Sequence, residues 1–201
     1  MIAIANKSLH PDDLALEALD ARRSVPSKQL DEPGPDEATL LRMLQSAVRV
    51  PDHGKRVPFR FLRIAGSARQ ALGERLVAIT RARDPDAAEG AIEKDRNRFS
   101  HAPLIIAVIA VLGEDEKIPE NERLLSAGCV CFALLQAAQA LGYGAQWLTG
   151  WPAYDRQVLD LLGLAAHEHI AGFVHIGTGK LEAPERDRPD PRALLSDWSA
   201  A

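Results

Sequence analysis

The stretch ENERLLSAGCVCFALLQAAQALGYGAQWLT, residues 120–149, decides how this chain folds. Its first part, residues 120–141, places apolar side chains on all sides of a helix and ends at Gly142, a residue type common just after helix C-termini. A helix that is apolar all round is buried, so we expect residues 120–141 to form a core helix. The residues that follow, 143–149, are predicted to form a short strand.

The rest of the chain mixes helices and strands, without a repeat or a break in composition. Residues 103–112 form a continuous apolar, β-branched run, which indicates a strand buried on both faces. Weaker patterns predict two more strands, at 59–64 and 169–178, and a loop at the Pro-rich stretch 25–35. The predicted helices are 12–21, 36–48, 67–83, 85–98 and 155–162. This order is typical of one α+β domain.

We therefore divide the chain into three parts. Residues 1–10 are expected to be an N-terminal tail, residues 11–180 a single domain, and residues 181–201 a C-terminal extension. The extension is Pro-rich and charged but carries Leu194, Leu195 and Trp198. We expect it to pack on the domain or on a partner subunit.

Composition excludes several classes of protein. The 201 residues are 46% hydrophobic and 26% charged, and the formal net charge of −4 argues against a nucleic-acid partner, so we expect a small-molecule partner. Cys129 and Cys131 are too close for an unstrained disulfide and too few for a zinc site. The N-terminus lacks a secretory signal pattern, and the run 104–112 is about half of a membrane span. These features predict a cytoplasmic protein that does not bind membranes.

Several common functional motifs are not met. Gly172, Gly177 and Lys180 lack the spacing of a phosphate-binding loop, and Gly142-Tyr143-Gly144 follows a helix and has no third glycine. His167-Glu168-His169 resembles half of a metal site, but the sequence identifies no further ligands, so no metal is predicted. There is no Gly-x-Ser-x-Gly motif, and neither cysteine has a basic neighbour. The sequence thus contains no recognisable motif for nucleophilic catalysis.

Cationic side chains recur where helices meet loops. They are Arg22 and Arg23, followed by Ser24, then Arg49, and then His53, Lys55 and Arg56. Arginine offers a planar fork of donors that matches a phosphate, and a hydroxyl adds a neutral donor. From the residues alone, a phosphate site and an ordinary solvated basic face both remain open.

Four motifs in order carry a resemblance to a known family. They are the helix leading into Arg22-Arg23-Ser24, the segment Val48-Arg49-Val50-Pro51-Asp52-His53 with Pro58-Phe59-Arg60-Phe61, Ser126-Ala127-Gly128-Cys129 within the long helix, and residues 140–147 at its end. Together, from about residue 13 to residue 191, they resemble the nitroreductase superfamily of FMN-dependent oxidoreductases. The short chain and the Pro-Asp-His loop are most similar to the small NAD(P)H nitroreductases.

The resemblance implies roles for particular residues. Arg22, Arg23 and Ser24 would hold the FMN phosphate, Arg49 and His53 would contact the flavin, and Trp147, Leu148 and Thr149 would line its ring. Lys55 or Arg49 would place a positive charge at the ring edge. The stretch assigned to NAD(P) matches Ala137, Ala138, Gln139, Ala140, Leu141 and Gly142.

The family also implies a fold and an activity. The fold is a central mixed sheet flanked by helices, in an intertwined homodimer with FMN at the subunit interface. The activity is hydride transfer from NAD(P)H through FMN to a nitroaromatic or quinone-like acceptor, with ping-pong kinetics and with the flavin carrying the chemistry. Residues 52–59 and Leu148 differ from the usual ring contacts, which leaves a non-catalytic flavin- or nucleotide-binding module as the alternative. A third hypothesis is a basic-faced protein that binds an acidic partner.

Overall fold

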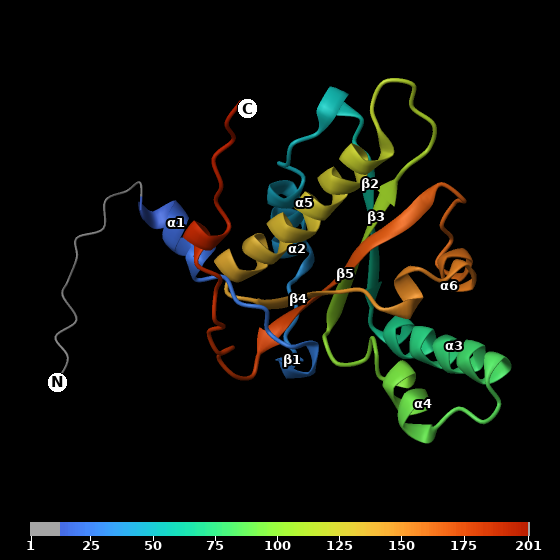
Figure 1. Ribbon diagram of the computed structural model, residues 1–201. Coiled ribbons are helices and arrows are strands. Elements are labelled where there is room, and N and C mark those ends of the chain that lie inside the picture. The colour runs from blue at the N-terminus through green and yellow to red at the C-terminus, as the bar shows by residue number, and fades with distance from the viewer. Residues whose placement is uncertain (1–12, 201) are drawn as a thin grey trace, which may run out of the picture.

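The computed structural model describes residues 13–200, so the predicted tail at residues 1–10 lies outside the described residues. A sheet of five strands is covered by helices on both faces (Figure 1). The strands are β1 (Leu30–Asp31), β2 (Phe59–Ala65), β3 (Leu104–Val111), β4 (Gly144–Leu148) and β5 (Glu168–Gly179). The helices are α1 (Asp13–Asp20), α2 (Glu37–Ala47), α3 (Ser67–Arg83), α4 (Glu89–Arg96), α5 (Glu120–Ala140) and α6 (Arg156–Leu161). The predicted α+β class is confirmed.

The sheet is antiparallel in each described pair of strands, which corrects the expectation of a mixed sheet. The strand order is β1-β5-β3-β2, and β4 pairs with β5 on the side away from β3. Strands β3 and β4 run in the same direction, as the crossover through α5 requires. Strand β5 lies between them, however, so each contact between neighbours is antiparallel.

Helix α5 is the core helix that the sequence predicts. It buries Val130, Leu134 and Ala138 against the sheet residues Ile106 and Val174. Gly142, with φ of +82°, ends it in the left-handed conformation that glycine adopts without strain. The helix is long and apolar enough to cross a membrane, but half of that apolar window is buried inside the fold, as in a core helix.

The opposite face of the sheet has its own core. Ile105, Ile109 and Phe173 pack there against Leu76 of α3 and Val158 of α6. Because Ile105 and Ile106 are neighbours in β3 and belong to different cores, β3 is buried on both faces, as its continuous apolar run predicts. The two faces matter for the site, because side chains that alternate along β4 also point to different faces.

The segment predicted as a loop, residues 25–35, contains more structure than expected. A 3₁₀ turn at Ser27–Gln29 leads into the two-residue strand β1, in which Leu30 pairs with Gly179 of β5. The side chain of Leu30 is 1% exposed. Burial of this one side chain holds the segment against the sheet, and it places the residues before it beside β4.

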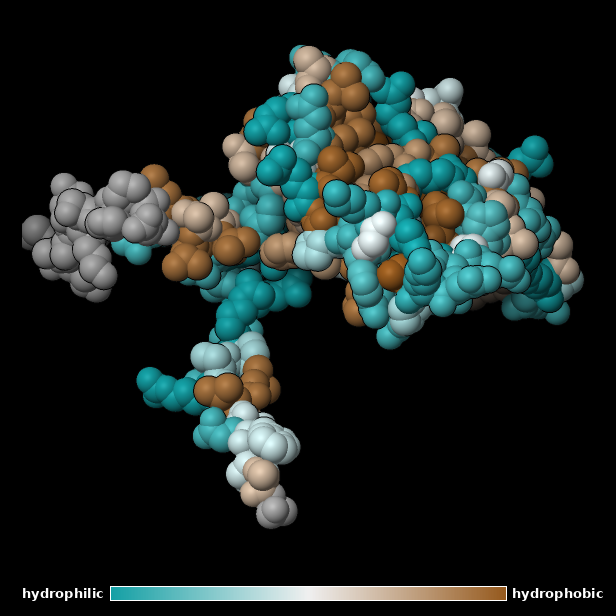
Figure 2. Space-filling model, turned by 90° about the horizontal axis from the view of Figure 1, so that it is seen from above, coloured by the Kyte–Doolittle hydropathy of each residue, from teal (hydrophilic) through white to brown (hydrophobic). Residues whose placement is uncertain are grey.

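The C-terminal extension leaves the sheet after β5. Leu194, Leu195 and Trp198 are 72%, 77% and 88% exposed, and Figure 2 shows the segment that ends at the C-terminus extending away from the body of the molecule. The described domain therefore does not cover these apolar side chains. The expectation that the extension packs on the domain or on a partner subunit stays a prediction.

Candidate functional site

The first cationic motif lies where α1 ends beside the C-terminus of α5. Arg22 donates a hydrogen bond to the hydroxyl of Ser24 at 3.2 Å, and the backbone N–H of Arg23 donates to Gln139 at 3.0 Å. Both arginine side chains and Ser24 are partly buried. The motif is thus anchored to α5 through its backbone, while the guanidinium group of Arg23 donates to the backbone carbonyls of Asp20 and Arg22.

The C-terminal extension adds two arginines to this motif. The charges of Arg188, Arg186 and Arg23 all lower the pKa of Arg22, after the larger effect of its partial burial. Glu185 pairs with Arg23 and with Arg188. We call Arg22, Arg23, Arg186 and Arg188 the arginine cluster. Among residues 13–200, Glu185 is the one acid that forms an ion pair with the cluster, so the described part of the cluster has an excess of positive charge.

Sequence reasoning did not find Arg186 and Arg188. They lie in a polar segment more than 150 residues after Arg22, as their numbers show, and no periodicity links the two segments. The available signal was their composition, two arginines in a segment that leaves the last strand of the sheet. Their position beside Arg22 depends on the long-range pairing of β1 with the end of β5.

A continuous segment leads from the arginine cluster to a cleft. The N–H of Val25 donates to Ala145 of β4 at 3.0 Å, and the N–H of Ser27 donates to the side chain of Gln146 at 2.6 Å. Beyond this point lies a cleft of about 520 Å³ between β4 and α4. The residues that line it include Ser27, Lys28, Lys94, Asn97, Arg98, His101 and Leu148.

The cleft is positively charged. Three cationic side chains, Lys28, Lys94 and Arg98, line it together with one acid, Glu93. Burial lowers the pKa of His101, and the charges of Lys28 and Lys180 lower it further, so the imidazole is held towards its neutral form. Sequence analysis did not single out Lys94 or Arg98, because charged residues on surface helices are common.

The predicted ring-lining residues divide between the two faces of the sheet. Trp147 pairs with Val174 and donates its indole N–H to the carbonyl of Ala171 at 3.1 Å, on the α5 side. Leu148 pairs with Phe173, on the opposite side, and lines the cleft. Thr149 follows and lines an adjoining cavity of about 290 Å³. Within one chain, Leu148 thus lines the cleft, Thr149 lines the adjoining cavity, and Trp147 lines neither.

The second cationic motif lies on the other face of the molecule. Arg49 is exposed at the end of α2 and lines an apolar groove of about 520 Å³ with Phe132, Ala137 and Ala140 of α5. The structure thus places Arg49 beside part of the predicted NAD(P) stretch, on the α5 side of the sheet. It does not bring Arg49 to the cleft that Leu148 lines.

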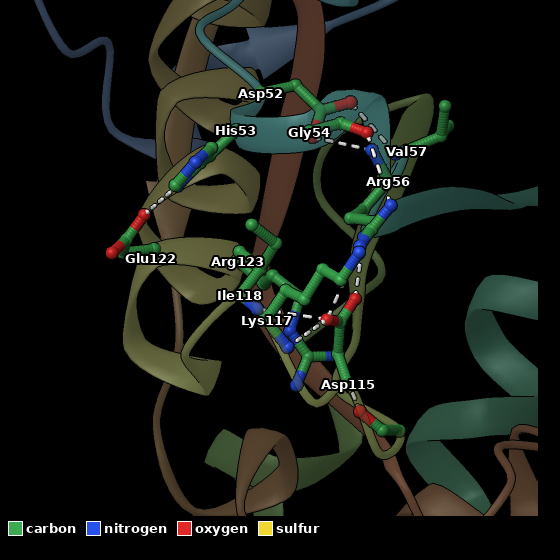
Figure 3. Close-up of polar contacts among 11 residues, drawn as sticks. Asp52, His53, Gly54, Arg56, Val57, Asp115, Lys117, Ile118, Glu122 and Arg123 are labelled. Carbon is green, nitrogen blue, oxygen red and sulfur yellow. Dashed lines mark hydrogen bonds and ion pairs between the residues drawn. The ribbon is translucent and has the colours of Figure 1, made fainter.

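His53 and Lys55 lie on a loop that is held by three acids, Asp52, Asp115 and Glu122. His53 contacts Glu122 of α5 at 2.6 Å, and Asp52 accepts the N–H groups of Arg56 and Val57 (Figure 3). Arg56 pairs with Asp115 at 2.6 Å, which holds the pKa of that carboxyl well below its usual range. Lys55 is exposed, with φ of +53°, and lies outside the cleft of this chain.

The stretch predicted for NAD(P) forms the C-terminal end of α5. Ala137 and Ala138 are buried, Gln139 is occupied by the backbone of Arg23, and Ala140, Leu141 and Gly142 are exposed. A helix C-terminus carries a partial negative charge and presents carbonyl groups. Its three exposed residues therefore suit an apolar or hydrogen-donating part of a ligand better than a phosphate.

No metal site is found within residues 13–200, and one of the two cysteine thiols is buried in the core. No group of three or more metal-binding side chains occurs there. Burial raises the pKa of Cys131 to about 12, so its thiol stays protonated inside α5. This thiol therefore acts as a packing residue, whereas Cys129 is exposed, so core packing of both thiols on the long helix is not found.

Comparison with known proteins places this geometry in a family. A family model described as "Nitroreductase family" matches residues 19–178, and the chain belongs to the nitroreductase family. It is 36% identical over 183 residues to "Putative NAD(P)H nitroreductase YdjA" of Escherichia coli K12, covering 90% of this chain and 98% of that protein. A Haemophilus influenzae protein named "Putative NAD(P)H nitroreductase" is 33% identical over 174 residues, covering 86% and 92%.

Solved structures support the same fold. The structure of a nitroreductase-like family protein from Bacillus cereus has a TM-score of 0.76 and 23% identity, covering 92% of this chain and 96% of that chain. A Desulfovibrio desulfuricans nitroreductase structure, solved in complex with FMN, has a TM-score of 0.69 and 23% identity, covering 96% and 100%. The predicted resemblance and fold are therefore confirmed.

Proposed function

We propose that this protein is an FMN-dependent NAD(P)H oxidoreductase of the nitroreductase type, which reduces nitroaromatic or quinone-like acceptors. The observation that carries the proposal is that residues 22–28 run beside β4 from the arginine cluster to the cleft that Leu148 lines. We call this segment, with β4 and the cleft, the candidate FMN site. The NAD(P)H nitroreductase names of the relatives and the FMN complex of a structural neighbour support the same assignment. We further propose that the protein acts in the cytoplasm.

The hydrogen-bond donors of the arginine cluster, at one end of the candidate FMN site, fit a phosphate. Guanidinium groups donate pairs of parallel hydrogen bonds to phosphate oxygens, and the hydroxyl of Ser24 adds a neutral donor. The cluster keeps an excess of positive charge after its pairing with Glu185, so a dianion would relieve repulsion. Arg22, Arg23 and Ser24, with Arg186 and Arg188, would thus hold the FMN phosphate.

The cleft at the other end of the candidate FMN site fits a flat ring. When bound, FMN supplies a ring that accepts a hydride from NAD(P)H and passes it to an acceptor. Leu148 offers an apolar wall for such a ring, while Lys28 and Lys94 place positive charge at the edge of the cleft. Positive charge there favours the negatively charged reduced ring, the role that the sequence analysis gave to Lys55 or Arg49.

We propose that the working unit is a homodimer with FMN at the subunit interface. Within one chain, Arg49, His53 and Lys55 lie away from the cleft, so they would contact a flavin only from a second copy. The exposed apolar side chains of α5, which include Leu125 and Phe132, offer a surface for that copy. One open ring face serving NAD(P)H and acceptor in turn gives ping-pong kinetics.

A spectroscopic titration tests the proposal. The purified protein is expected to bind FMN with a shift in the visible spectrum, and NADH or NADPH should bleach that spectrum under anaerobic conditions, with the colour returning after a quinone is added. A protein that cannot bind FMN would overturn the assignment. A protein that binds FMN but is not bleached by either nucleotide would instead be the non-catalytic flavin-binding module.

A further inference from the structure

Two lysines from different elements line the cleft between β4 and α4. Lys28 belongs to the 3₁₀ turn that is hydrogen-bonded to Gln146 of β4, and Lys94 belongs to α4. Both side chains are exposed, and neither forms an ion pair within residues 13–200. We call Lys28 and Lys94 the lysine pair.

The other charged side chains at the cleft already have partners. Among the described residues, the acid that lines the cleft is Glu93, which accepts hydrogen bonds from Arg96 at 2.6 Å and from the amide of Asn97. These hydrogen bonds lower the pKa of Glu93, so its carboxylate stays ionised and paired with Arg96. Arg98 pairs with Asp95 at 2.9 Å. The excess charge of the cleft is therefore that of the lysine pair.

Beside the lysine pair, the cleft offers an apolar wall. Leu148 is partly buried and supplies this wall, and the methylene stems of the lysines add apolar surface. The volume of about 520 Å³ lies in the range of small-molecule sites. A flat ring that bears a carboxylate matches both features, because the ring covers the apolar wall while the carboxylate accepts hydrogen bonds from ammonium groups. A neutral ring would leave the charges of the lysine pair without a partner.

We propose that the cleft selects electron acceptors that carry a carboxylate on the reducible aromatic ring, with Lys28 and Lys94 donating hydrogen bonds to the carboxylate oxygens. The inference rests on the proposed function, and it narrows the nitroaromatic or quinone-like acceptors to their anionic members. For a nitrobenzoate, a hydride and a proton convert the nitro group to a nitroso group and water, while NAD(P)H is oxidised to NAD(P)⁺. The carboxylate takes no part in this exchange and serves only in binding.

Stopped-flow measurement of the oxidative half-reaction tests this selection, because no NAD(P)H is present. The FMN-saturated protein is reduced photochemically without oxygen and mixed with 4-nitrobenzoate or with its neutral methyl ester. The ratio of the two rate constants, carboxylate over ester, is compared between variants, which cancels the intrinsic difference between the two acceptors. We expect this ratio to fall about two- to fivefold in Lys28→Gln and in Lys94→Gln, the effect of losing one exposed ion pair. Added salt should lower the ratio of the wild-type protein.

Two further variants serve as controls. Lys117→Gln removes the same charge from an exposed lysine that does not line the cleft, and it should leave the ratio unchanged. Lys94→Arg keeps the charge at the cleft and should retain most of the wild-type ratio.

His101 reports on the cleft without turnover and without FMN. Burial lowers its pKa, and the charges of Lys28 and Lys180 lower it further. A carboxylate bound beside Lys28 would offset these charges and raise the pKa of His101. We expect benzoate to raise this pKa in an NMR titration of the flavin-free protein, and benzamide, its neutral analogue, to leave it unchanged.

The outcomes distinguish this inference from the proposed function. If Lys28→Gln and Lys94→Gln keep the wild-type ratio, as Lys117→Gln should, the inference is overturned. The same holds if these two variants slow only the reduction by NADH or NADPH, since the lysine pair then serves the phosphates of the nucleotide. If the protein binds no FMN, the proposed function fails, and the benzoate titration alone decides: a raised pKa of His101 supports the inference, and an unchanged one overturns it.

Discussion

At the scale of single residues, the arginine cluster shows what one sequence can reveal. The pair Arg22-Arg23 with Ser24 is a local motif, so its chemistry is visible from its spacing alone. Arg186 and Arg188 lie beside Arg22 because of the tertiary fold, and a single sequence does not indicate which distant residues come close together. The local half of a phosphate site was therefore predictable, and the distant half was not.

The Arg22→Ala variant tests the cluster. It removes a charged donor of a kind that contributes about 1.5–3 kcal/mol, so we expect FMN affinity to fall about ten- to a hundredfold in a fluorescence titration. Lys28 lines the cleft and is thus unsuitable as a control. Arg81→Ala, an exposed charge near the end of α3, is the matched change and should leave affinity unchanged. Equal losses in the two variants would remove Arg22 from the site.

The ion pair of Arg60 with Glu168 gives the protein a sensitivity to acid. Arg60 donates two hydrogen bonds to Glu168, at 2.6 and 2.7 Å. These hydrogen bonds lower the pKa of Glu168 from 4.5 to about 2, against the opposing effect of burial. Because the folded pKa lies below the unfolded one, the pair stabilises the fold above about pH 4.5, and this contribution is lost as pH falls towards 2.

We therefore expect Glu168→Gln to be less stable than wild type near neutral pH and to lose less stability on acidification. Urea unfolding midpoints at about pH 6 and about pH 3 measure the difference. The exposed pair of Arg63 with Glu37 is the control, since surface pairs contribute little, and Glu37→Gln should follow the wild-type pH dependence. If the urea midpoints of Glu168→Gln and wild type fall by the same amount between the two pH values, the expectation is contradicted.

The separation of Trp147 from Leu148 could have been predicted from the sequence. Side chains alternate between the two faces of a strand, so a strand at 143–149 already separates Trp147 from Leu148. Only the structure shows which face carries the cleft, since that depends on where α4 packs. The roles of Arg49, His53 and Lys55 depend on a second copy and stay predictions.

At the scale of elements, the long apolar patterns were read correctly and the two-residue strand β1 was missed. The continuous apolar run of β3 and the all-round apolar surface of α5 each span enough residues to be recognised from the sequence. Strand β1 has two residues, too few for any pattern, and it is held by a single buried leucine. The antiparallel arrangement also escaped prediction, because the position of β5 between β3 and β4 is a property of the whole sheet.

The contact between α3 and α4 is set by a glycine. A Cβ on Gly73 would lie 2.1 Å from the backbone carbonyl oxygen of Arg96, which cannot rotate away. We expect Gly73→Ala to destabilise the fold by about 1–3 kcal/mol through overpacking, despite the better helix propensity of alanine. Because α4 and the residues just after it place Lys94 and Arg98 at the cleft, FMN affinity should fall as well.

Gly90→Ala is the matched control for stability. It is also a helical position, in α4, but a Cβ there would have no neighbour within 4 Å. Thermal unfolding should show a small gain for Gly90→Ala, up to about 1 kcal/mol, and a clear loss for Gly73→Ala. A Gly73→Ala protein as stable as wild type would mean that the two helices can separate freely.

At the scale of the whole molecule, one chain leaves several apolar side chains uncovered. Phe132 and Leu125 of α5 are 44% and 66% exposed, and the extension adds Trp198. We expect Phe132→Glu to shift the protein from dimer to monomer in light scattering and to weaken FMN binding. The control, Leu161→Glu, changes an equally exposed residue of α6, at 42%, and should leave the mass unchanged. Identical masses for the two variants would exclude α5 from the interface.

The arginine cluster also affects measurements made without flavin. Burial, and the charges of Arg188, Arg186 and Arg23, lower the pKa of Arg22, so the empty cluster carries a repulsive cost. Any polyvalent anion that binds the folded state would offset this cost and raise stability by mass action. We expect the Tm of the flavin-free protein to rise with added phosphate at constant ionic strength, and this rise to be absent in Arg22→Ala.

The choice of buffer thus becomes part of the chemistry of this protein. Two preparations of the same chain, one purified in phosphate and one in an organic amine buffer, would differ in apparent Tm and in how readily they take up flavin. Inorganic phosphate would act as a competitor of the cofactor, because both offer the same dianion to the same guanidinium groups. Cofactor loading would then depend on the phosphate content of the surrounding solution as well as on the supply of flavin.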